Sequence, residues 1–247
     1  MIKSEAVHCT ALTKGEKFLH NKISYEIYSE AGTYHKQHGI ENQDAIKVGM
    51  KDDYFFCAIS DGCGSSKYAK QAADCTIKYA EKFFNKYCSA FFSDNKRTAC
   101  KKMIFGIQNS LRKKALQFEV SLSEMKCTLV MMIIDTKYQN ATIIHIGDGI
   151  VAKISNGNNR ILSYPENGAT KNYTYVVNSP NVLNHLRIKS LKIASSDTFI
   201  VASDGLYENA YKSSALFGLL NRLDNIIDKK DDCTYCKISC NSELKTI

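Results

Sequence analysis

Hydrophobic residues follow two periodicities along the 247-residue chain, one typical of strands and one typical of helices. Residues 54–60 form a continuous apolar run that ends at Asp61-Gly62, which predicts a buried strand. From Ala69 to Tyr87, apolar residues recur at the spacing of one helical face, which predicts a helix packed on a sheet. Ser65-Ser66 precede this segment and are suited to cap its first turn. A second amphipathic helix is predicted over residues 96–118.

After residue 127 the pattern changes to short apolar runs separated by turn residues. Three runs, 127–135, 141–147 and 150–155, predict an antiparallel meander. Further strands are predicted at 173–178, 187–193, 198–203 and 233–239, with a helix between Asn209 and Asp228. Because helices interrupt the strands in blocks rather than alternating with them, the pattern indicates an α+β fold of antiparallel sheets covered by helices.

The composition is that of a folded globular protein. Hydrophobic residues make up 44% of the chain, charged residues 23%, and there are only two prolines, so the chain can bury a sizeable core. The length is within the range of one large domain, and we expect residues 1–247 to form a single domain.

The net charge of +8 is dispersed over the sequence. Its longest basic clusters, at residues 101–102, 112–114 and 229–230, lie beside apolar residues at helical spacing and indicate solvated helix faces. Nucleic-acid binding is therefore not expected. The strongest apolar stretch, 129–134, is far shorter than the roughly 20 residues of a membrane helix, so no membrane association is expected. No secretion signal is visible, and we expect the ten cysteines to be reduced thiols of a cytoplasmic protein.

Three apolar runs end at the same dipeptide, and this recurrence is the main chemical signal. The pairs are Asp61-Gly62, Asp148-Gly149 and Asp204-Gly205. Asp-Gly is a favoured turn sequence, and a turn explains Asp148 better than Asp61 or Asp204, because a helix or a long segment follows those two. Carboxylates gathered at the ends of neighbouring strands repel one another unless a cation is bound. Asp44 and the pair Asp231-Asp232 add further carboxylates, and oxygen ligands suit Mg²⁺ or Mn²⁺.

Taken in order, seven short segments of the chain resemble the type-2C metal-dependent serine/threonine protein phosphatases. The resemblance is to the bacterial branch with a Gly-x-x-His element ahead of an Asn-Gln-Asp motif, and it extends from Gly32 to Ile238. The matching segments are Gly32-Thr33-Tyr34-His35, Asn42-Gln43-Asp44-Ala45, Ile59-Ser60-Asp61-Gly62-Cys63-Gly64-Ser65, Cys127-Thr128-Leu129-Val130, Ile146-Gly147-Asp148-Gly149, Ala202-Ser203-Asp204-Gly205-Leu206 and Asp231-Asp232-Cys233-Thr234.

The resemblance implies a four-layer αββα sandwich, with two antiparallel sheets flanked by helices. It also implies a two-metal centre in which Asp61 bridges both ions, and Asp148 helps to hold a weaker third ion. The remaining ligands that it implies are Asp44, the backbone carbonyl of Gly62, Asp204 and Asp231. Two Mg²⁺ or Mn²⁺ ions in such a centre would activate a bridging water for attack on phosphoserine or phosphothreonine. The implied partners are a phosphorylated protein substrate and a cognate kinase that the enzyme opposes.

The chain departs from the commonest family pattern near its phosphate-binding element. Gln43 stands where a glutamate is usual, and no arginine lies just upstream of Asn42. His35 is the predicted substitute, as a phosphate contact or a proton donor to the leaving group, with His38 as an alternative or a simple loop residue. Two other functions are kept open: a catalytically weak module that binds phosphoproteins, and a phosphatase of a small phosphorylated metabolite.

Overall fold

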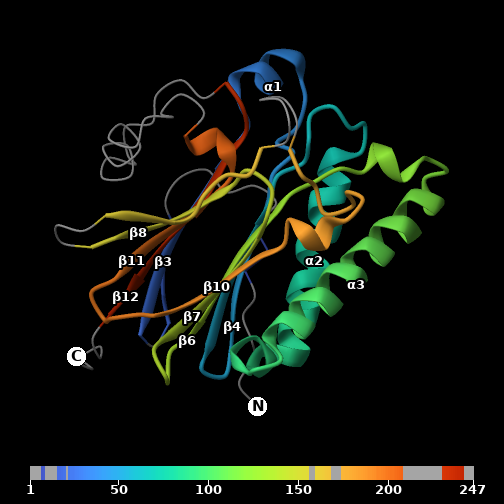
Figure 1. Ribbon diagram of the computed structural model, residues 1–247. Helices are drawn as coiled ribbons and strands as arrows, with labels where there is room; N and C mark the ends of the chain where they lie inside the picture. Colours follow the sequence, from blue (N-terminus) through green and yellow to red (C-terminus); the bar gives the residue numbers. More distant parts are fainter. Residues whose placement is uncertain are drawn as a thin grey trace.

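Two six-stranded antiparallel sheets pack against each other, and two long helices cover the outer face of one of them (Figure 1). The computed structural model describes residues 7–8, 16–20, 22–155, 159–167, 174–207 and 230–241. The predicted α+β class and the sandwich of two antiparallel sheets are confirmed. The predicted helix between Asn209 and Asp228 lies outside the described residues.

The first sheet carries the helices and has the strand order β1-β4-β5-β6-β7-β10. Every neighbouring pair is antiparallel, and Tyr54 opposite Asp135 sets the register of the two central strands, β5 and β6. The strands are β1 (Val7–His8), β4 (Ala45–Lys51), β5 (Tyr54–Ser60), β6 (Leu129–Asp135), β7 (Asn140–Ile146) and β10 (Arg187–Lys192).

The second sheet has the order β2-β3-β12-β11-β8-β9, and its neighbouring strands are also antiparallel. Its strands are β2 (Glu16–His20), β3 (Ile23–Glu30), β8 (Ile150–Ile154), β9 (Arg160–Ser163), β11 (Thr198–Ala202) and β12 (Cys233–Cys240). Strands from the two ends of the chain, β3 and β12, therefore lie side by side in its middle.

The helices α2 (Ala69–Tyr87) and α3 (Lys96–Gln117) lie together on the first sheet (Figure 1). A short helix, α1 (Thr33–His38), lies at one end of the sandwich. The 3₁₀ segments are η1 (Cys88–Phe92), η2 (Leu122–Glu124), η3 (Val182–Asn184) and η4 (Asp204–Leu206). No helix in these described ranges is long and apolar enough to cross a bilayer.

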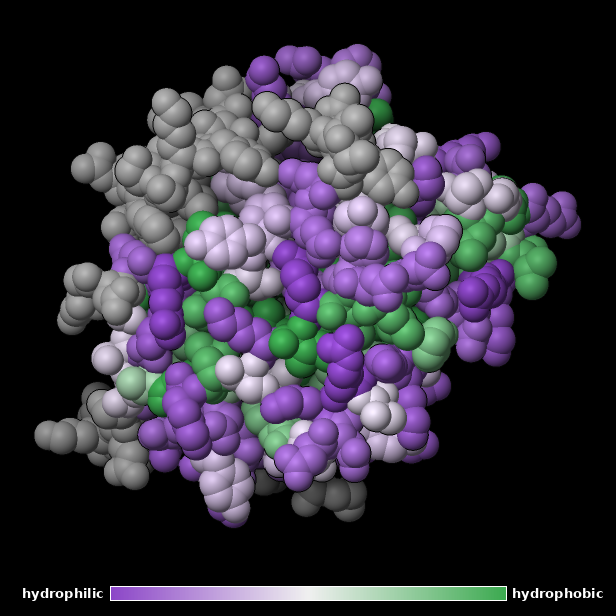
Figure 2. Space-filling model, viewed as in Figure 1, coloured by the Kyte–Doolittle hydropathy of each residue, from purple (hydrophilic) through white to green (hydrophobic). Residues whose placement is uncertain are grey.

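The apolar run of β5 is continuous because both faces of this strand are buried. Phe56 and Ala58 belong to the cluster formed with α2 and α3, whereas Phe55, Cys57 and Ile59 belong to the cluster between the two sheets. Alternation along a strand sends successive side chains to opposite faces, so a strand between two apolar layers needs an apolar residue at every position. On the face shown in Figure 2, hydrophobic residues form a central band surrounded by hydrophilic residues.

The expected meander over residues 127–155 is wrong in its last strand. β6 and β7 form a hairpin, but β8 pairs with β11 and β9 in the second sheet. The segment at Asp148-Gly149 is therefore a crossing between sheets and not a hairpin turn. The periodicity could not reveal this, because a crossing and a hairpin both interrupt an apolar run with a short polar segment.

Two smaller predictions are also wrong, and several strands were not predicted. Within 173–178, the described residues contain only an isolated bridge, from Thr174 to Asn167, and no strand. The N-cap position of α2 is occupied by Tyr68, whose side chain makes no capping hydrogen bond, while the Ser66 hydroxyl contacts the Ser123 carbonyl. The strands missed from the sequence are β1 to β4 and β9. Polar residues alternate with apolar ones in the first half of β3, and Lys47 interrupts β4, so neither strand shows the continuous hydrophobic run that marked the other strands.

Candidate metal centre

Four aspartates line one cleft of about 330 Å³ at an end of the sandwich. Asp61 follows β5 of the first sheet, and Asp148 lies in the crossing from β7 of the first sheet to β8 of the second. Asp204 follows β11 and Asp231 precedes β12, so these two come from the second sheet. The cleft therefore lies at the seam between the sheets, where antiparallel strands bring ends that are distant in sequence to one edge. Gly62, Cys63, Gly64, Ser65, Lys126, Thr174 and Val176 complete its lining.

The position of Asp61 is fixed by the first residues of the neighbouring β6 segment. The Thr128 amide donates to the Asp61 carbonyl at 2.9 Å, and the Asp61 amide donates to Thr128 Oγ1 at 3.1 Å. The hydroxyl of Ser60 donates to the Thr128 carbonyl at 2.6 Å. With both backbone groups of Asp61 engaged, its carboxylate is held at the cleft without relying on a side-chain partner.

Glycine is required immediately after Asp61 because three backbone segments converge there. A Cβ on Gly62 would lie 2.6 Å from the Ala69 carbonyl oxygen and 2.8 Å from that of Gln43. No side chain fits at such distances, so the Asp-Gly sequence here meets a packing requirement rather than a turn requirement.

Asp148 is buried and is held from two sides. Thr174 Oγ1 donates to its Oδ2, and the Tyr207 hydroxyl donates to its backbone carbonyl. Its other carboxylate oxygen, Oδ1, is buried and has no hydrogen-bond partner. Thr174 was not singled out from the sequence, and only its place in the cleft wall reveals this contact.

Asp44 lies buried behind the cleft rather than on its wall. Ser203 Oγ donates to Asp44 Oδ2 at 2.7 Å, while Asp44 Oδ1 is buried without a partner. Asp44 therefore links the Asn42-Gln43-Asp44 segment to the end of β11, next to Asp204.

The carboxylates of this cluster disfavour one another's ionisation. One oxygen from each of Asp61, Asp148 and Asp204 lies within 4.8 Å of the others. Burial, followed by the charges of Asp204 and Asp44, raises the pKa of Asp61 well above its ordinary value. Burial also raises the pKa of Asp44 to about 7, against the opposing hydrogen bond from Ser203. A divalent cation would remove this penalty, because it neutralises the carboxylates that repel one another.

The donor set fits a hard divalent ion. The clustered groups are carboxylates, which suit Mg²⁺ and Mn²⁺, and no histidine or cysteine belongs to the Asp61-Asp148-Asp204 group. The unpartnered buried oxygens of Asp44 and Asp148 are also expected if a cation or its bound waters complete their coordination. The residues present therefore fit the predicted metal.

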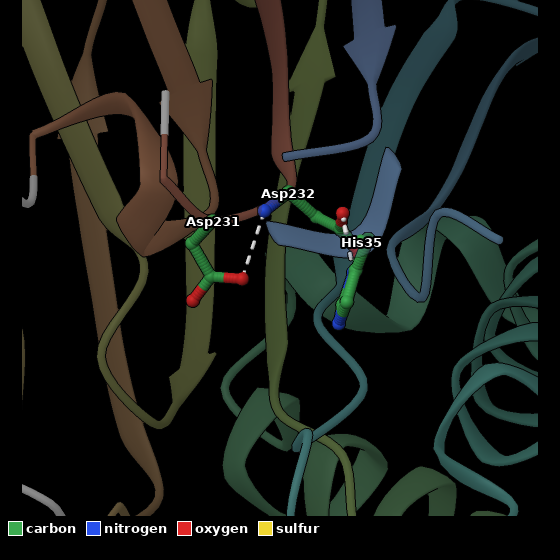
Figure 3. A group of neighbouring side chains, drawn as sticks. All are labelled: His35, Asp231 and Asp232. Carbon is green, nitrogen blue, oxygen red and sulfur yellow. Dashed lines mark hydrogen bonds and ion pairs between the residues drawn. The ribbon is translucent and has the colours of Figure 1, made fainter. Parts of the chain in front are cut away.

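Asp231 and Asp232 are adjacent in sequence, but their side chains lie in different environments (Figure 3). Asp231 is exposed and lines the cleft, where its Oδ1 accepts a hydrogen bond from the Asp232 amide at 2.8 Å. Asp232 is buried, and its carboxylate accepts from the Gly32 amide at 2.8 Å, the Gln43 amide at 2.5 Å and His35 Nδ1 at 2.8 Å. Asp232 therefore joins the Gly-x-x-His element and the Asn-Gln-Asp motif to the start of β12.

The two candidate histidines occupy different environments. His35 is buried, and a ring nitrogen lies within 4.8 Å of a carboxylate oxygen of Asp231, but His35 is not among the residues that line the cleft. His38 is exposed, its ring stacks near that of Tyr34, and its Nδ1 contacts the Tyr34 carbonyl at 2.8 Å. Of the two, only His35 is connected to the carboxylate cluster.

Comparison with known proteins assigns the chain to a family. The sequence profile of protein phosphatase 2C matches residues 31–244. The chain belongs to the protein phosphatase 2C family. Among curated proteins, no sequence matches it.

Solved structures share the phosphatase fold at low sequence identity. The S. agalactiae serine/threonine phosphatase matches with a TM-score of 0.65 and 15% identity, over 89% of this chain and 100% of that one. PppA, a key regulatory component of T6SS in Pseudomonas aeruginosa, matches with a TM-score of 0.63 and 18% identity, over 88% of this chain and 97% of that one. The catalytic domain of the phosphatase PstP in complex with two manganese ions matches with a TM-score of 0.59 and 11% identity, over 89% and 99%.

Within this phosphatase family, most of the predicted site residues of the chain are brought together. Asp61, Gly62, Asp148, Asp204 and Asp231 share the cleft, Asp44 lies directly behind it, and His35 lies beside Asp231. Reasoning from sequence named Asp232 as a further carboxylate but not the hydrogen bonds that it accepts, and it assigned no role to Thr128, Thr174 or Lys126. A signal was available for Asp232 and Thr128, because both lie inside segments that carry the family resemblance. None was available for Lys126 and Thr174, which resemble the many other polar surface residues of the chain.

Proposed function

We propose that this chain is a Mg²⁺- or Mn²⁺-dependent phosphatase that removes phosphate from phosphoserine and phosphothreonine in proteins. The observation that carries the proposal is the cluster of Asp61, Asp148 and Asp204 carboxylates, with Asp231, in one open cleft of a protein phosphatase 2C domain. PstP, which has the same fold, is a serine/threonine phosphatase in complex with two manganese ions.

In this proposal Asp61, Asp204, Asp231 and the Gly62 carbonyl hold two ions, with Asp44 behind them, and Asp148 helps to hold a third. Bound ions would activate a water for attack at phosphorus and stabilise the charge that develops on the transferred group. The residues of the chain keep the ligands in place: Thr128 fixes the backbone of Asp61, Ser203 holds Asp44, and Thr174 orients Asp148.

We retain His35 as a proposed phosphate contact or proton donor. Asp232 holds its Nδ1, which fixes the plane of the ring and leaves Nε2 as the atom that could meet a substrate.

The cellular setting is proposed on the same basis. A phosphoprotein substrate and an opposing kinase follow from the proposed activity. The nine cysteines that the structure describes are all free thiols, which supports a reducing compartment such as the cytoplasm. The profile match over residues 31–244 and the core shared by the two sheets support a single domain for residues 1–247.

The test is hydrolysis of p-nitrophenyl phosphate and of a phosphothreonine peptide with Mn²⁺, with Mg²⁺ and with chelator. We expect metal-dependent turnover that Asp61→Asn and Asp204→Asn each reduce by at least about a hundredfold, because each removes a charged ligand. Asp74→Asn, which changes an exposed carboxylate paired with Lys70, is the matched control and should leave turnover unchanged.

A folded, metal-loaded wild type without turnover would contradict the proposal. If that protein still bound the phosphopeptide, the phosphoprotein-binding module would be the better description. Preferential hydrolysis of small phosphorylated metabolites would instead favour the metabolite phosphatase.

A further inference from the structure

Lys126 places a positive charge in the wall of the carboxylate cleft. It precedes the Cys127-Thr128 segment and lines the cleft together with Asp61, Asp148 and Asp204. Every other charged residue in the lining is an aspartate. A lysine in this position therefore has a different electrostatic role from the dispersed surface lysines of the chain.

The backbone of Lys126 is fixed against the loop that follows Asp61. Its carbonyl accepts a hydrogen bond from the Cys63 amide at 3.1 Å, and the next residue, Cys127, forms an antiparallel bridge with Gly62. The preceding residue, Met125, is fully buried. These backbone contacts fix the Cα position of Lys126 close to Gly62, whose carbonyl is a proposed metal ligand.

The ammonium group of Lys126 has no competing partner in the described part of the chain. Lys126 is half-buried, and its side chain forms no hydrogen bond or ion pair with any residue in the ranges that the structure describes. A half-buried ammonium that is not held by a carboxylate remains available to a ligand.

Other cations near the cleft are already engaged. Lys70 donates to the Asp44 carbonyl and to Asp74 Oδ1, both at 2.9 Å. Lys36 pairs with Glu30, and Arg187 lies 3.3 Å from Glu166 and donates to the Gly147 carbonyl. None of these three lines the cleft.

The charge balance of the cleft explains what such a lysine would bind. Four carboxylates and one ammonium group line it, with Asp44 behind them, and the divalent ions of the proposed centre would neutralise most of this negative charge. The ammonium group of Lys126 is then not needed to balance the carboxylates, and it can pair with a phosphate dianion that approaches the ions. Lysine is a common phosphate ligand, and it acts as a point charge without requiring a fixed planar geometry.

We propose that Lys126 is the cationic residue that contacts the substrate phosphate, in place of the arginine that is missing upstream of Asn42. This inference rests on the proposed phosphatase function. His35 is less suited to be the principal cation, because Asp232 already holds its Nδ1 and its ring is not part of the cleft wall.

The test separates phosphate binding from metal binding by calorimetric titration. Wild type, Lys126→Met and Lys126→Arg are titrated first with Mn²⁺ and then, in saturating Mn²⁺, with inorganic phosphate. We expect Lys126→Met to weaken phosphate binding by about tenfold or more, because a charge-assisted contact is lost. Mn²⁺ binding should be unchanged or tighter, because the substitution removes a cation from beside the ligands. Lys126→Arg should retain most of the phosphate affinity.

Lys67→Met is the matched control. Lys67 is exposed in the same loop region and lies outside the cleft lining, so its removal should alter neither titration. In steady-state assays, Lys126→Met should raise KM for the phosphothreonine peptide, whereas the control should not.

Phosphate binding that stays within twofold of wild type in Lys126→Met would overturn the proposal. Loss of Mn²⁺ and phosphate binding together would also overturn it, because that outcome indicates a structural role. Lys126→Gln gives the same comparison if the methionine variant does not fold. A wild type that binds Mn²⁺ and phosphate but hydrolyses neither substrate would contradict the phosphatase function. The comparison of phosphate affinities between wild type and Lys126→Met would still decide the proposal for Lys126.

Discussion

Asp232 Oδ1 lies 2.8 Å from His35 Nδ1, across 197 residues of sequence. The same carboxylate accepts hydrogen bonds from the amides of Gly32 and Gln43 (Figure 3 shows the histidine contact). One buried side chain thus holds the start of α1, the segment before β4 and the start of β12 in a common position. Its neighbour Asp231 is placed in the cleft by the same segment.

Asp232→Asn should destabilise the protein by about 1–3 kcal/mol. An asparagine has one acceptor oxygen where the aspartate has two, so one of the three donors loses its partner. Urea unfolding measures the change, with Asp74→Asn at an exposed site as the control. Equal unfolding midpoints for the two variants would contradict the role assigned to Asp232.

Without metal, stability should fall as pH rises from about 4 to about 7. The folded-state pKa of Asp44 is raised from 3.8 to about 7, mainly by burial, and those of Asp61, Asp148 and Asp231 are also raised. A group with a raised pKa contributes stability below its unfolded value, and this contribution is lost as pH passes through the folded value. Thermal unfolding in chelator should therefore give a higher Tm at pH 5 than at pH 8.

Saturating Mn²⁺ should reverse this trend, because the ion favours the ionised carboxylates and its binding weakens as they become protonated. The difference in Tm between metal-loaded and metal-free protein should be larger at pH 8 than at pH 5. A difference independent of pH would show that the carboxylate cluster is not the metal site.

Thr128→Val should weaken metal binding by about tenfold. The substitution keeps the shape of the side chain but leaves the Asp61 amide without its acceptor, so Asp61 is held less firmly. Thr142→Val is the matched control, since Thr142 Oγ1 is equally buried but donates to the Phe91 carbonyl. Calorimetric Mn²⁺ titration should show a loss only for Thr128→Val, and equal losses in both variants would refute this prediction.

Gly205→Ala should disturb the cleft far more than Gly39→Ala. A Cβ on Gly205 would lie 2.0 Å from the Asp232 carbonyl oxygen, so the segments carrying Asp204 and Asp231 would have to separate. Gly39 has a φ of 65° but open space around it, so alanine there costs only about 1 kcal/mol of backbone strain. Mn²⁺ affinity should fall in Gly205→Ala and stay unchanged in Gly39→Ala. Calorimetric titration measures the affinity, and urea unfolding of the same variants measures the free energy of unfolding.

The sequence was most informative at the aspartates that end apolar runs, because a carboxylate directly after a buried strand is unfavourable unless it has a partner or a bound ion. The abrupt ends of the runs at Asp61 and Asp204 predicted both the strand ends and the gathering of these carboxylates in one place. The partition of strands between the two sheets was less accessible, because β7 and β8 have similar apolar runs and differ only in their partners. The place of Lys126 could not be predicted, since only the bridge between Gly62 and Cys127 brings it to the cleft.

The carboxylates of the cleft come from both sheets: Asp61 from the first, Asp204 and Asp231 from the second, and Asp148 from the crossing between them. Ions held by carboxylates of both sheets would link the two sheets at this end of the sandwich. Metal concentration would then govern how often the two layers part at that end, and amide hydrogen exchange at the adjoining ends of β5 and β11 would report the free metal level.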